Sequence, residues 1–432
     1  MTRSRHYVLA VLFLVYVTAY LDRQLLAMLL PAIKRDLDLS DTLLGLLTGP
    51  AFAAFYIILG FPIARIADRA SRRIVLAVSI GLWSVMTMAT GFARDVAMLA
   101  LCRVGVGIGE AGCTPPAHSI IADLFPAHER GTALAIYSLG ISAGMIIAFA
   151  AGGWLGEAVG WQRAFILIGL PGLFVAGLVF FTVREPERRV GPADGQAGIF
   201  SIWRYLFAIP SFRHLLLAGG ITNLGFIGGL QWIPSFFIRT HGLSATEVGL
   251  WLAGAAGVIG GCGTLFGGWM TDRLGRRDRR WYLWVPAIGM AIATPAFVLI
   301  FSLGDGRLAL MLYAIPAFCV ALGVAPIYAV GQSLARADMR AVAAATMLFA
   351  INLLGLGLGP QLVGVLSDLL AARYGAASLG AALKLVLAVG TAWPILHFML
   401  AGRTLLADME HAHGETIEHA SPTDAASSLN PA

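Results

Sequence analysis

The sequence predicts an all-α membrane protein with twelve transmembrane helices in two six-helix bundles. Apolar residues make up 58% of the chain and charged residues only 12%, and the mean hydropathy is +0.79. An average soluble domain has ~25% charged residues, so a chain with so few could not cover a water-facing surface. The composition therefore excludes a soluble enzyme and indicates a surface that faces lipid.

Twelve apolar runs are each long enough to cross a bilayer, which needs ~20 residues. Because lipid offers the backbone no hydrogen-bond partner, each run is expected to be a helix. The runs cover residues 7–30, 43–64, 74–93, 96–121, 132–156, 161–182, 214–238, 245–270, 282–302, 308–333, 341–367 and 379–402. The first run lacks a cleavage site of small residues, so we interpret it as a helix and not as a signal peptide.

Basic residues are distributed unevenly over the loops. If the amino terminus is cytoplasmic, the cytoplasmic side holds 20 of the 30 Lys and Arg residues and the opposite side holds 8. This bias predicts a cell membrane protein, such as one of the bacterial inner membrane, with both termini cytoplasmic. It also explains the net charge of +6 without a nucleic-acid partner. The four cysteines lie in apolar runs without a CxxC pair, so we expect no disulfide, metal or cofactor.

The chain divides at a stretch rich in charge, glycine and proline. We expect an amino-terminal six-helix bundle over residues 1–182, a cytoplasmic linker over 183–210 and a carboxy-terminal six-helix bundle over 211–404. The polar residues 405–432 are expected to form a disordered cytoplasmic tail.

The two halves share one loop sequence. ARIADRASRR at 64–73 follows the second run, and GWMTDRLGRR at 268–277 follows the eighth. Two parallel six-helix halves predict a transporter with its binding site between them. GWMTDRLGRR resembles the loop signature GxxxDRxGRR of the major facilitator superfamily at every position, and the first copy keeps its aspartate and three arginines.

In that superfamily such loops hold the outward-open state closed at the cytoplasmic surface, like a latch. A carboxylate there could bind arginines or helix amino termini across the seam between the halves. The plainer alternative is that these arginines only determine topology. The gating candidates are Asp68, Arg69, Arg72, Arg130, Asp272, Arg273 and Arg276.

Charges inside two of the runs indicate where the site lies. Asp22 and Arg23 are in the first run, and Arg103 and Glu110 are in the fourth. A charge at a helix centre costs ~2.5–3.5 kcal/mol on insertion scales, so these groups should face the protein interior or water. Arg103 and Glu110 are expected on one helix face, ~10 Å apart along its axis. Asp22 could bridge them if the two helices adjoin.

Two interpretations of each charged group remain open. Arg103 either forms a structural ion pair with Asp22 or Glu110, or binds an anion. Glu110 either carries a proton or only neutralises Arg103. Burial and a neighbouring arginine act on a carboxyl group in opposite directions, so a group held between them can exchange its proton when its exposure changes. We therefore expect proton coupling through Asp22 and Glu110.

Glycines and prolines interrupt the fourth run. The glycines between 105 and 112 are expected to allow close helix packing, because an apolar span without a preceding strand is no phosphate loop. Pro115 and Pro116 should kink or end the helix.

Residues 109–137, together with YLDRQ at 20–24, resemble the Spinster branch of the superfamily. The matching positions are Asp22, Arg103, Glu110, Asp123 and Arg130. The chain departs from that branch at 112–116, which is usually richer in hydroxyl groups. The resemblance implies an amphipathic, often lipid-like substrate and proton coupling. Met145 follows Gly144 where the superfamily's antiporters have Gly-Pro, which disfavours a drug/proton exchanger.

Polar residues of the second half complete the predicted site, although helix-packing hydrogen bonds would explain most of them. The predicted substrate-binding residues are Arg103, Tyr20, Asn223, Gln231, Trp232, Tyr328 and Asn352. An anionic head near Arg103 and a tail against the second half would suit an amphiphile, carried by a monomer in contact with membrane lipids. The alternative is a proton symporter of small organic acids, such as sugar acids or aromatic acids. It would need a second cation, which is not evident in the last six runs. A non-transporting receptor would need neither the loops nor the buried charges.

Overall fold

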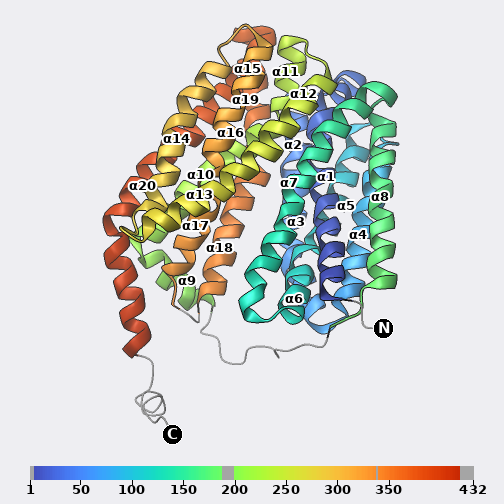
Figure 1. Ribbon diagram of the computed structural model, residues 1–432. Helices are drawn as coiled ribbons and strands as arrows, with labels where there is room; N and C mark the ends of the chain where they lie inside the picture. The colour runs from blue at the N-terminus through green and yellow to red at the C-terminus, as the bar shows by residue number, and fades with distance from the viewer. Residues whose placement is uncertain (1–3, 187–198, 337–338, 419–432) are drawn as a thin grey trace.

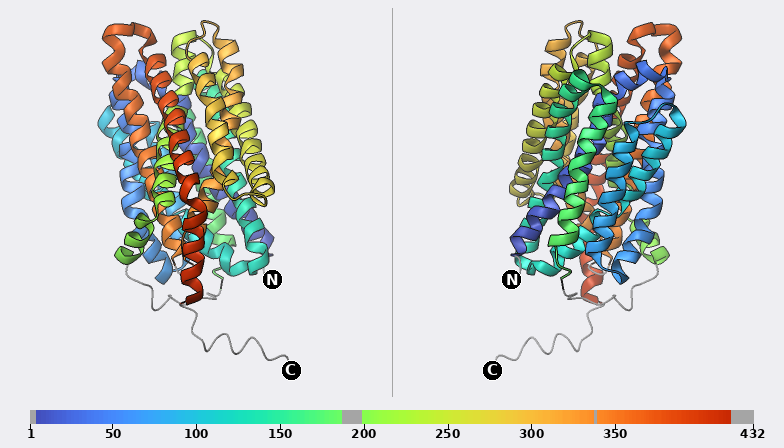
Figure 2. Two further views of the ribbon diagram at one scale, coloured as in Figure 1. Left: turned by 90° about the vertical axis from the view of Figure 1, so that its left-hand side faces the viewer. Right: turned by 90° about the vertical axis from the view of Figure 1, so that its right-hand side faces the viewer.

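The protein is a bundle of long helices. The structure, a computed structural model, describes residues 4–186, 199–336 and 339–418, and no strand occurs among them. The helices run along one long axis and form two groups that lie side by side (Figures 1 and 2). The start of α1 and the end of α20 lie at one end of the bundle, which we call the terminal end. The opposite end is called the far end.

The first group, called the amino-terminal half, precedes α9 in the chain. It comprises α1 (Arg5–Leu37), α2 (Asp41–Thr48), α3 (Pro50–Arg69), α4 (Arg72–Thr90), α5 (Val96–Ala111), α6 (Thr114–Leu124), α7 (Ala127–Val159) and α8 (Trp161–Thr182). Helix α9 (Ile199–Ala208) lies at the terminal end (Figure 1).

The second group, called the carboxy-terminal half, follows α9. It comprises α10 (Pro210–Leu230), α11 (Ile233–His241), α12 (Ala245–Leu252), the π-helix η1 (Ala253–Ile259), α13 (Gly260–Gly275), α14 (Trp281–Ile300), α15 (Gly306–Leu312), α16 (Ala314–Ala321), α17 (Val324–Ser333), α18 (Arg340–Asn352), the π-helix η2 (Leu353–Leu358), α19 (Gly359–Tyr374), the 3-10 turn η3 (Gly375–Ala377) and α20 (Ser378–Glu418).

Ten helical segments of the described residues are long and apolar enough to cross a membrane, or eleven when α10 and α11, bent by 43°, count as one span. The last segment, 342–410, contains two of the predicted runs. The chain reverses at η3, and α20 then packs beside α19 (Figure 1). When this segment is divided at η3, the described helices correspond to the twelve predicted runs and to two groups of six.

Local sequence explains where these helices begin. Ser40 accepts a hydrogen bond from the backbone N–H of Leu43 at the start of α2, at 3.1 Å. Asp95 accepts one from Met98 at the start of α5, at 2.8 Å. Side chains of this kind satisfy donors that a helix leaves free in its first turn. As predicted, the regular ladder of the fourth run is broken before its two prolines, which lie in the first turn of α6.

The glycines of α5 allow close helix packing, as predicted. A Cβ at Gly107 would lie 2.5 Å from the backbone oxygen of Phe52 in α3, and one at Gly109 would lie 2.8 Å from Trp83 in α4. Backbone contact of this kind holds α3 against α5, and the Phe52 ring lies 5.4 Å from the guanidinium carbon of Arg103.

Two expectations outside the bundles need correction. The predicted linker 183–210 contains the helix α9, although residues 187–198 lie outside the described part of the chain. The predicted disorder from residue 405 is wrong for 405–418, because α20 continues to Glu418. Leu405 is buried there, and the Asp408 carboxylate accepts a hydrogen bond from the backbone N–H of Ser211 at 3.0 Å. These contacts dock the polar segment against the start of α10.

Candidate functional site

Four charged side chains form a cluster inside the amino-terminal half. Asp22 and Arg23 come from the middle of α1, and Arg103 and Glu110 come from α5. Asp22 and Arg103 are each 3% exposed, and Glu110 is 1% exposed. Buried charges of this kind persist only when other charges or polar groups compensate them, so the partners of each group decide what the cluster does.

The ion pair of the cluster joins Arg23 to Glu110. The Arg23 Nε donates to Oε2 of Glu110, and the other carboxylate oxygen is buried without a hydrogen-bond partner. The Arg23 side chain is 11% exposed, whereas that of Glu110 is fully covered. Arg23 is therefore the more accessible partner of this ion pair.

Three aromatic rings surround the guanidinium of Arg23. The ring centres of Tyr20, Phe52 and Tyr56 lie 5.2, 5.1 and 4.9 Å from its central carbon. An arginine among aromatic rings at this distance is stabilised by cation–π attraction. The same rings offer an apolar surface next to the charge.

Asp22 and Arg103 are less completely paired. The Thr87 hydroxyl of α4 donates to Oδ2 of Asp22 at 2.6 Å, and Oδ1 of Asp22 is buried without a partner. The Nε and Nη1 atoms of Arg103 are also buried without hydrogen-bond partners. The carboxylates of Asp22 and Glu110 both attract Arg103 electrostatically without forming an ion pair with it. It therefore combines a neighbouring countercharge with N–H groups that remain free to donate.

The cluster agrees with the sequence in its members and differs in its pairing. Asp22, Arg103 and Glu110 lie in one cluster, and the Arg23–Glu110 ion pair links α1 to α5. Among the described residues, however, Arg103 forms an ion pair with neither carboxylate. Glu110 is neutralised by Arg23, to which the sequence assigned no role. Adjacency to Asp22 in an apolar run was the one sequence signal for Arg23.

Three of the predicted binding residues are half-buried. Tyr20 stands beside the cluster, and Tyr328 of α17, in the other half, is half-buried. Asn352, at the end of α18, is half-buried.

Other predicted binding residues make contacts within their own half. The Asn223 amide donates to the Gly219 backbone oxygen at 2.8 Å. Trp232 is fully buried and donates to the Pro360 oxygen at 2.9 Å, so in this conformation it packs within the carboxy-terminal half. Gln231, beside it, is 5% exposed and leaves its Oε1 without a partner.

Arg72 anchors the terminal end of the amino-terminal half and does not reach across the seam. Its guanidinium donates to Asp123 at 2.5 Å, to Ser119 at 2.8 Å, to Glu185 at 2.7 Å and to the Pro186 oxygen at 2.9 Å. Partial burial alone would raise the pKa of Glu185, but hydrogen bonds from the Arg73 backbone and from the side chains of Arg72 and Ser71 hold it below its ordinary value. All these partners belong to one half, so in this conformation Arg72 stabilises the terminal end of the amino-terminal half.

The other gating candidates are more accessible. Asp68, Arg69 and Arg276 are exposed. The Asp272 carboxylate accepts a hydrogen bond from Tyr282 at 2.7 Å, and Arg273 lies over Trp269 at 5.9 Å. Arg130 donates to the Phe125 oxygen at 3.0 Å. None of these contacts, all made among described residues, crosses between the halves.

The two halves are joined at the far end by a polar seam. Asp41 of α2 accepts two hydrogen bonds from Arg239 of α11, at 2.8 and 3.1 Å, and one from Ser367 of α19 at 2.6 Å. Lys34 of α1 pairs with the same carboxylate at 2.8 Å. The Asp368 carboxylate accepts from the backbone N–H groups of residues 41 and 42.

A second far-end contact strengthens this seam. Glu157 of α7 accepts hydrogen bonds from the Ala245 backbone and the Thr246 hydroxyl, at the start of α12. All hydrogen bonds and ion pairs that join described residues of different halves belong to these two groups or to the neighbouring Gln361–Thr42 contact. The conformation is therefore closed at the far end.

Two helical bundles, joined at one end and holding a buried charge cluster, define the protein as a secondary transporter in a membrane. Residues 12–360 match the family described as the Major Facilitator Superfamily, and the chain belongs to this superfamily.

Related proteins show how far this similarity extends. The chain is 37% identical over 381 residues to an MFS-type efflux pump of Mycolicibacterium smegmatis, covering 88% of each protein. It is 27% identical over 307 residues to the probable galactarate/D-glucarate transporter GudP of Bacillus subtilis, covering 64% of this chain and 67% of GudP.

A solved structure confirms the resemblance to the Spinster branch. A bacterial homolog of the human lysosomal transporter Spinster, in its inward-facing and unoccupied conformation, matches with a TM-score of 0.81 and 30% identity. The match covers 94% of this chain and 99% of that chain.

Proposed function

We propose that the protein carries an amphipathic organic anion together with a proton. The observation that carries this proposal is the buried cluster of two arginines and two carboxylates, in which Arg103 keeps unpartnered N–H groups. When all four groups are ionised, Asp22 and Glu110 balance the charges of Arg23 and Arg103. The empty and deprotonated cluster is then neutral.

Charge balance explains how a proton and an anion would travel together. A proton on Glu110 removes the countercharge of Arg23 and leaves the cluster with one net positive charge. A bound monoanion restores neutrality, whereas the anion without the proton would leave one net negative charge. Because an uncompensated charge is costly in a buried site, we expect only the two neutral states to change conformation. This rule predicts one proton for each monoanion.

The surroundings of the two arginines favour an anion with an apolar part. Phe52 lies near both guanidinium groups, and Tyr20 and Tyr56 add two further rings beside Arg23. A head group can therefore meet N–H donors while its tail lies against aromatic surface. The resemblance to the Spinster branch, which implies an amphipathic substrate, also supports this proposal.

We further propose that the terminal end is cytoplasmic, in a bacterial inner membrane. The excess of Lys and Arg in the loops of that side supports this orientation. The exposed Asp68 and Arg69 of the first loop, with Asp272, Arg273 and Arg276 of the second, would close the terminal end when the far-end seam opens. Arg130, beside α6, would support the same closure.

A second candidate function is the symport of small organic acids, and Arg23 is the observation that favours it. Such a transporter needs a second cation, and α1 supplies one beside Arg103. The similarity to a probable galactarate/D-glucarate transporter points in the same direction.

A transport assay separates the two candidates. Purified protein in liposomes would be tested with a pH gradient against alkyl phosphates and fatty acids of increasing chain length, and against glucarate and galactarate. Affinity that rises with chain length supports the amphipathic anion, and transport of the sugar acids alone would overturn it. In Arg103→Ala, anion binding should weaken by more than tenfold, since a hydrogen bond to a charged group contributes ~1.5–3 kcal/mol. Unchanged binding would refute the head-group assignment.

A further inference from the structure

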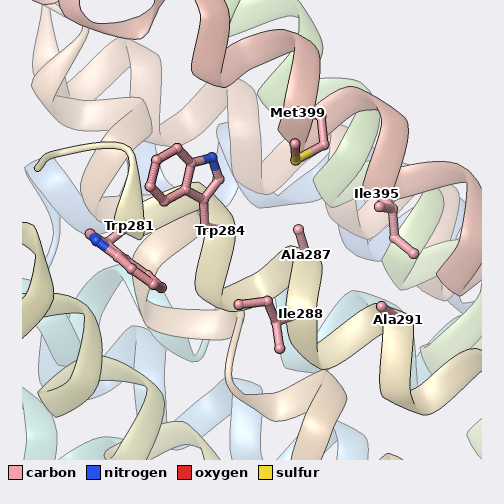
Figure 3. Close-up of a pocket in the computed structure, with 7 residues that line it drawn as sticks. All are labelled: Trp281, Trp284, Ala287, Ile288, Ala291, Ile395 and Met399. Atoms are coloured by element: carbon pink, nitrogen blue, oxygen red, sulfur yellow. The ribbon is translucent and has the colours of Figure 1, made fainter.

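An apolar groove lies between α14 and α20 on the outside of the carboxy-terminal half. Its volume is about 310 Å³, which is near the lower limit for ligand pockets in proteins. Its lining consists of Trp281, Trp284, Ala287, Ile288, Ala291, Ile395 and Met399. Figure 3 shows the two tryptophans at one end, with the smaller side chains following along α14 and two α20 residues facing them.

The groove faces the membrane. Residues 281–300 form one of the membrane-spanning segments, and Ile288 in the groove wall is 49% exposed. Tryptophans are enriched where a protein crosses the membrane–water interface, which places Trp281 and Trp284 near the head groups. The small side chains Ala287 and Ala291 leave the depression between the helices that an acyl chain could occupy.

The mouth of the groove is strongly basic. Residues 276–280, which lead into α14, contain four arginines and one aspartate and so carry a net charge of +3. Arg280 directly precedes the groove, and its Nε is buried without a hydrogen-bond partner. On α20, Arg403 follows Met399 by one helical turn and is exposed. Residues four apart lie on one helix face, so Arg403 stands at the same mouth.

Neither cation has an acidic partner in the part of the chain that the structure describes. No ion pair involves Arg280 or Arg403, and Asp278 accepts a hydrogen bond only from the backbone N–H of Arg280, at 2.8 Å. The Trp284 indole nitrogen lies 3.6 Å from the position that a Cβ at Gly402 would take, so its N–H faces α20 beside Arg403. The mouth thus combines two unpaired arginines with an indole donor.

We propose that this groove is a binding site for an anionic phospholipid. One acyl chain lies in the groove, and the phosphate and its anionic head group meet Arg280, Arg403 and the Trp284 N–H. Basic pockets between membrane helices recognise anionic head groups in this way. A zwitterionic lipid would fill the apolar part equally well, but its ammonium group would face the two arginines.

Native mass spectrometry of the full-length protein in detergent tests this site, with dioleoyl phosphatidylglycerol and dioleoyl phosphatidylcholine as probes. The dissociation constant of the first bound lipid is compared for the unsubstituted protein and for Arg280→Gln/Arg403→Gln. Each arginine near an anionic head group contributes to the binding free energy of the lipid. The loss of two arginines should therefore weaken phosphatidylglycerol binding by about 30-fold. Phosphatidylcholine binding should change by less than about threefold.

Two further variants separate the groove from general surface charge. Arg184→Gln/Arg204→Gln removes the same charge from exposed residues of the terminal end that do not line the groove, and should leave phosphatidylglycerol binding within about threefold. Ala291→Trp fills the groove and should weaken both lipids, with Ala287→Leu as a milder variant if the tryptophan prevents folding. Equal binding by the two double variants would overturn the proposal, as would full binding in a folded groove-filling variant.

Discussion

The far-end seam makes a quantitative prediction at Asp41. This carboxylate is 1% exposed and holds Arg239 and Ser367 of the opposite half together with Lys34 of its own. Asp41→Asn keeps the shape of the side chain but removes its charge. Because the contacts to the opposite half exist only while the far end is closed, the substitution should favour the far-end-open state.

The size of this effect follows from burial. Breaking a fully buried ion pair costs ~3–5 kcal/mol. The Arg239 and Lys34 side chains remain 26% and 27% exposed, so solvent screens part of the loss. We therefore expect a shift of ~2–3 kcal/mol, which is about 30- to 150-fold in the ratio of the two states. A far-end-open population of about 1% would rise to about a quarter at the lower limit.

Electron–electron double resonance measures these populations. Spin labels at Arg94→Cys and Ser302→Cys, both exposed at the far end and in different halves, report the far-end distance in a Cys262→Ser background. Glu247→Gln is the matched control, because Glu247 pairs with Arg307 at the same end but within one half. Similar distance distributions for Asp41→Asn, the control and the unsubstituted protein would show that the seam does not hold the state.

Three further predictions concern the charge cluster and the Arg72 network. Glu110→Gln leaves the cluster with one net positive charge that only a bound anion can balance. A pH gradient should therefore no longer drive net uptake of the anion, while exchange of anions across the membrane continues. Measurable gradient-driven uptake of the anion would contradict the charge rule. In Arg103→Gln the cluster is neutral when Glu110 is protonated and no anion is bound, whereas a bound monoanion leaves one net negative charge. A pH gradient should therefore no longer drive anion uptake into liposomes, and uptake at the rate of the unsubstituted protein would count against the charge rule. Glu185→Gln should destabilise the protein by about 1 kcal/mol at neutral pH, since the side chain is 31% exposed. The folded-state pKa of Glu185 lies below its ordinary value, so the stability difference between the variant and the unsubstituted protein should be present above pH ~4.3 and disappear as the pH falls further. Thermal melting of both proteins at pH 7 and below pH 4 measures this stability difference. A difference of the same size at both pH values would contradict the prediction.

Hydropathy predicted the helical bundle well because a backbone segment in lipid can satisfy its hydrogen bonds only by forming a helix. A long apolar run must satisfy its own hydrogen bonds, so run length and number almost determine the helices. The same argument does not apply outside the membrane. Helix α9 and the end of α20 depend on tertiary contacts, such as that of Asp408 with the start of α10. Local sequence patterns do not predict contacts of this kind.

The sequence predicted which charged residues form the cluster but not that Arg23 pairs with Glu110, and the reason is geometric. Consecutive helical residues point about 100° apart, so Asp22 and Arg23 face different neighbours. In the structure Asp22 meets Thr87 of α4, whereas Arg23 meets Glu110 of α5. Which face of α1 turns toward α5 depends on helix packing, and so does the position of the Phe52 ring. The charged residues can be identified from the sequence, but the orientation of α1 and of the Phe52 ring cannot.

Helix α1 connects the charge cluster to the far-end seam. It carries Arg23 in its middle and Lys34 near its far end, where Lys34 binds Asp41. The two residues are 11 positions apart, which is ~16 Å along a helix. Pro31 lies between them and removes one backbone hydrogen bond, so α1 can bend there. We infer that release of Arg23 from a protonated Glu110 changes the position of α1 and thereby the Lys34–Asp41 contact. Helix α1 would then couple the charge state of the cluster to opening of the far-end seam. This coupling would explain how only the neutral states of the cluster allow the conformation to change.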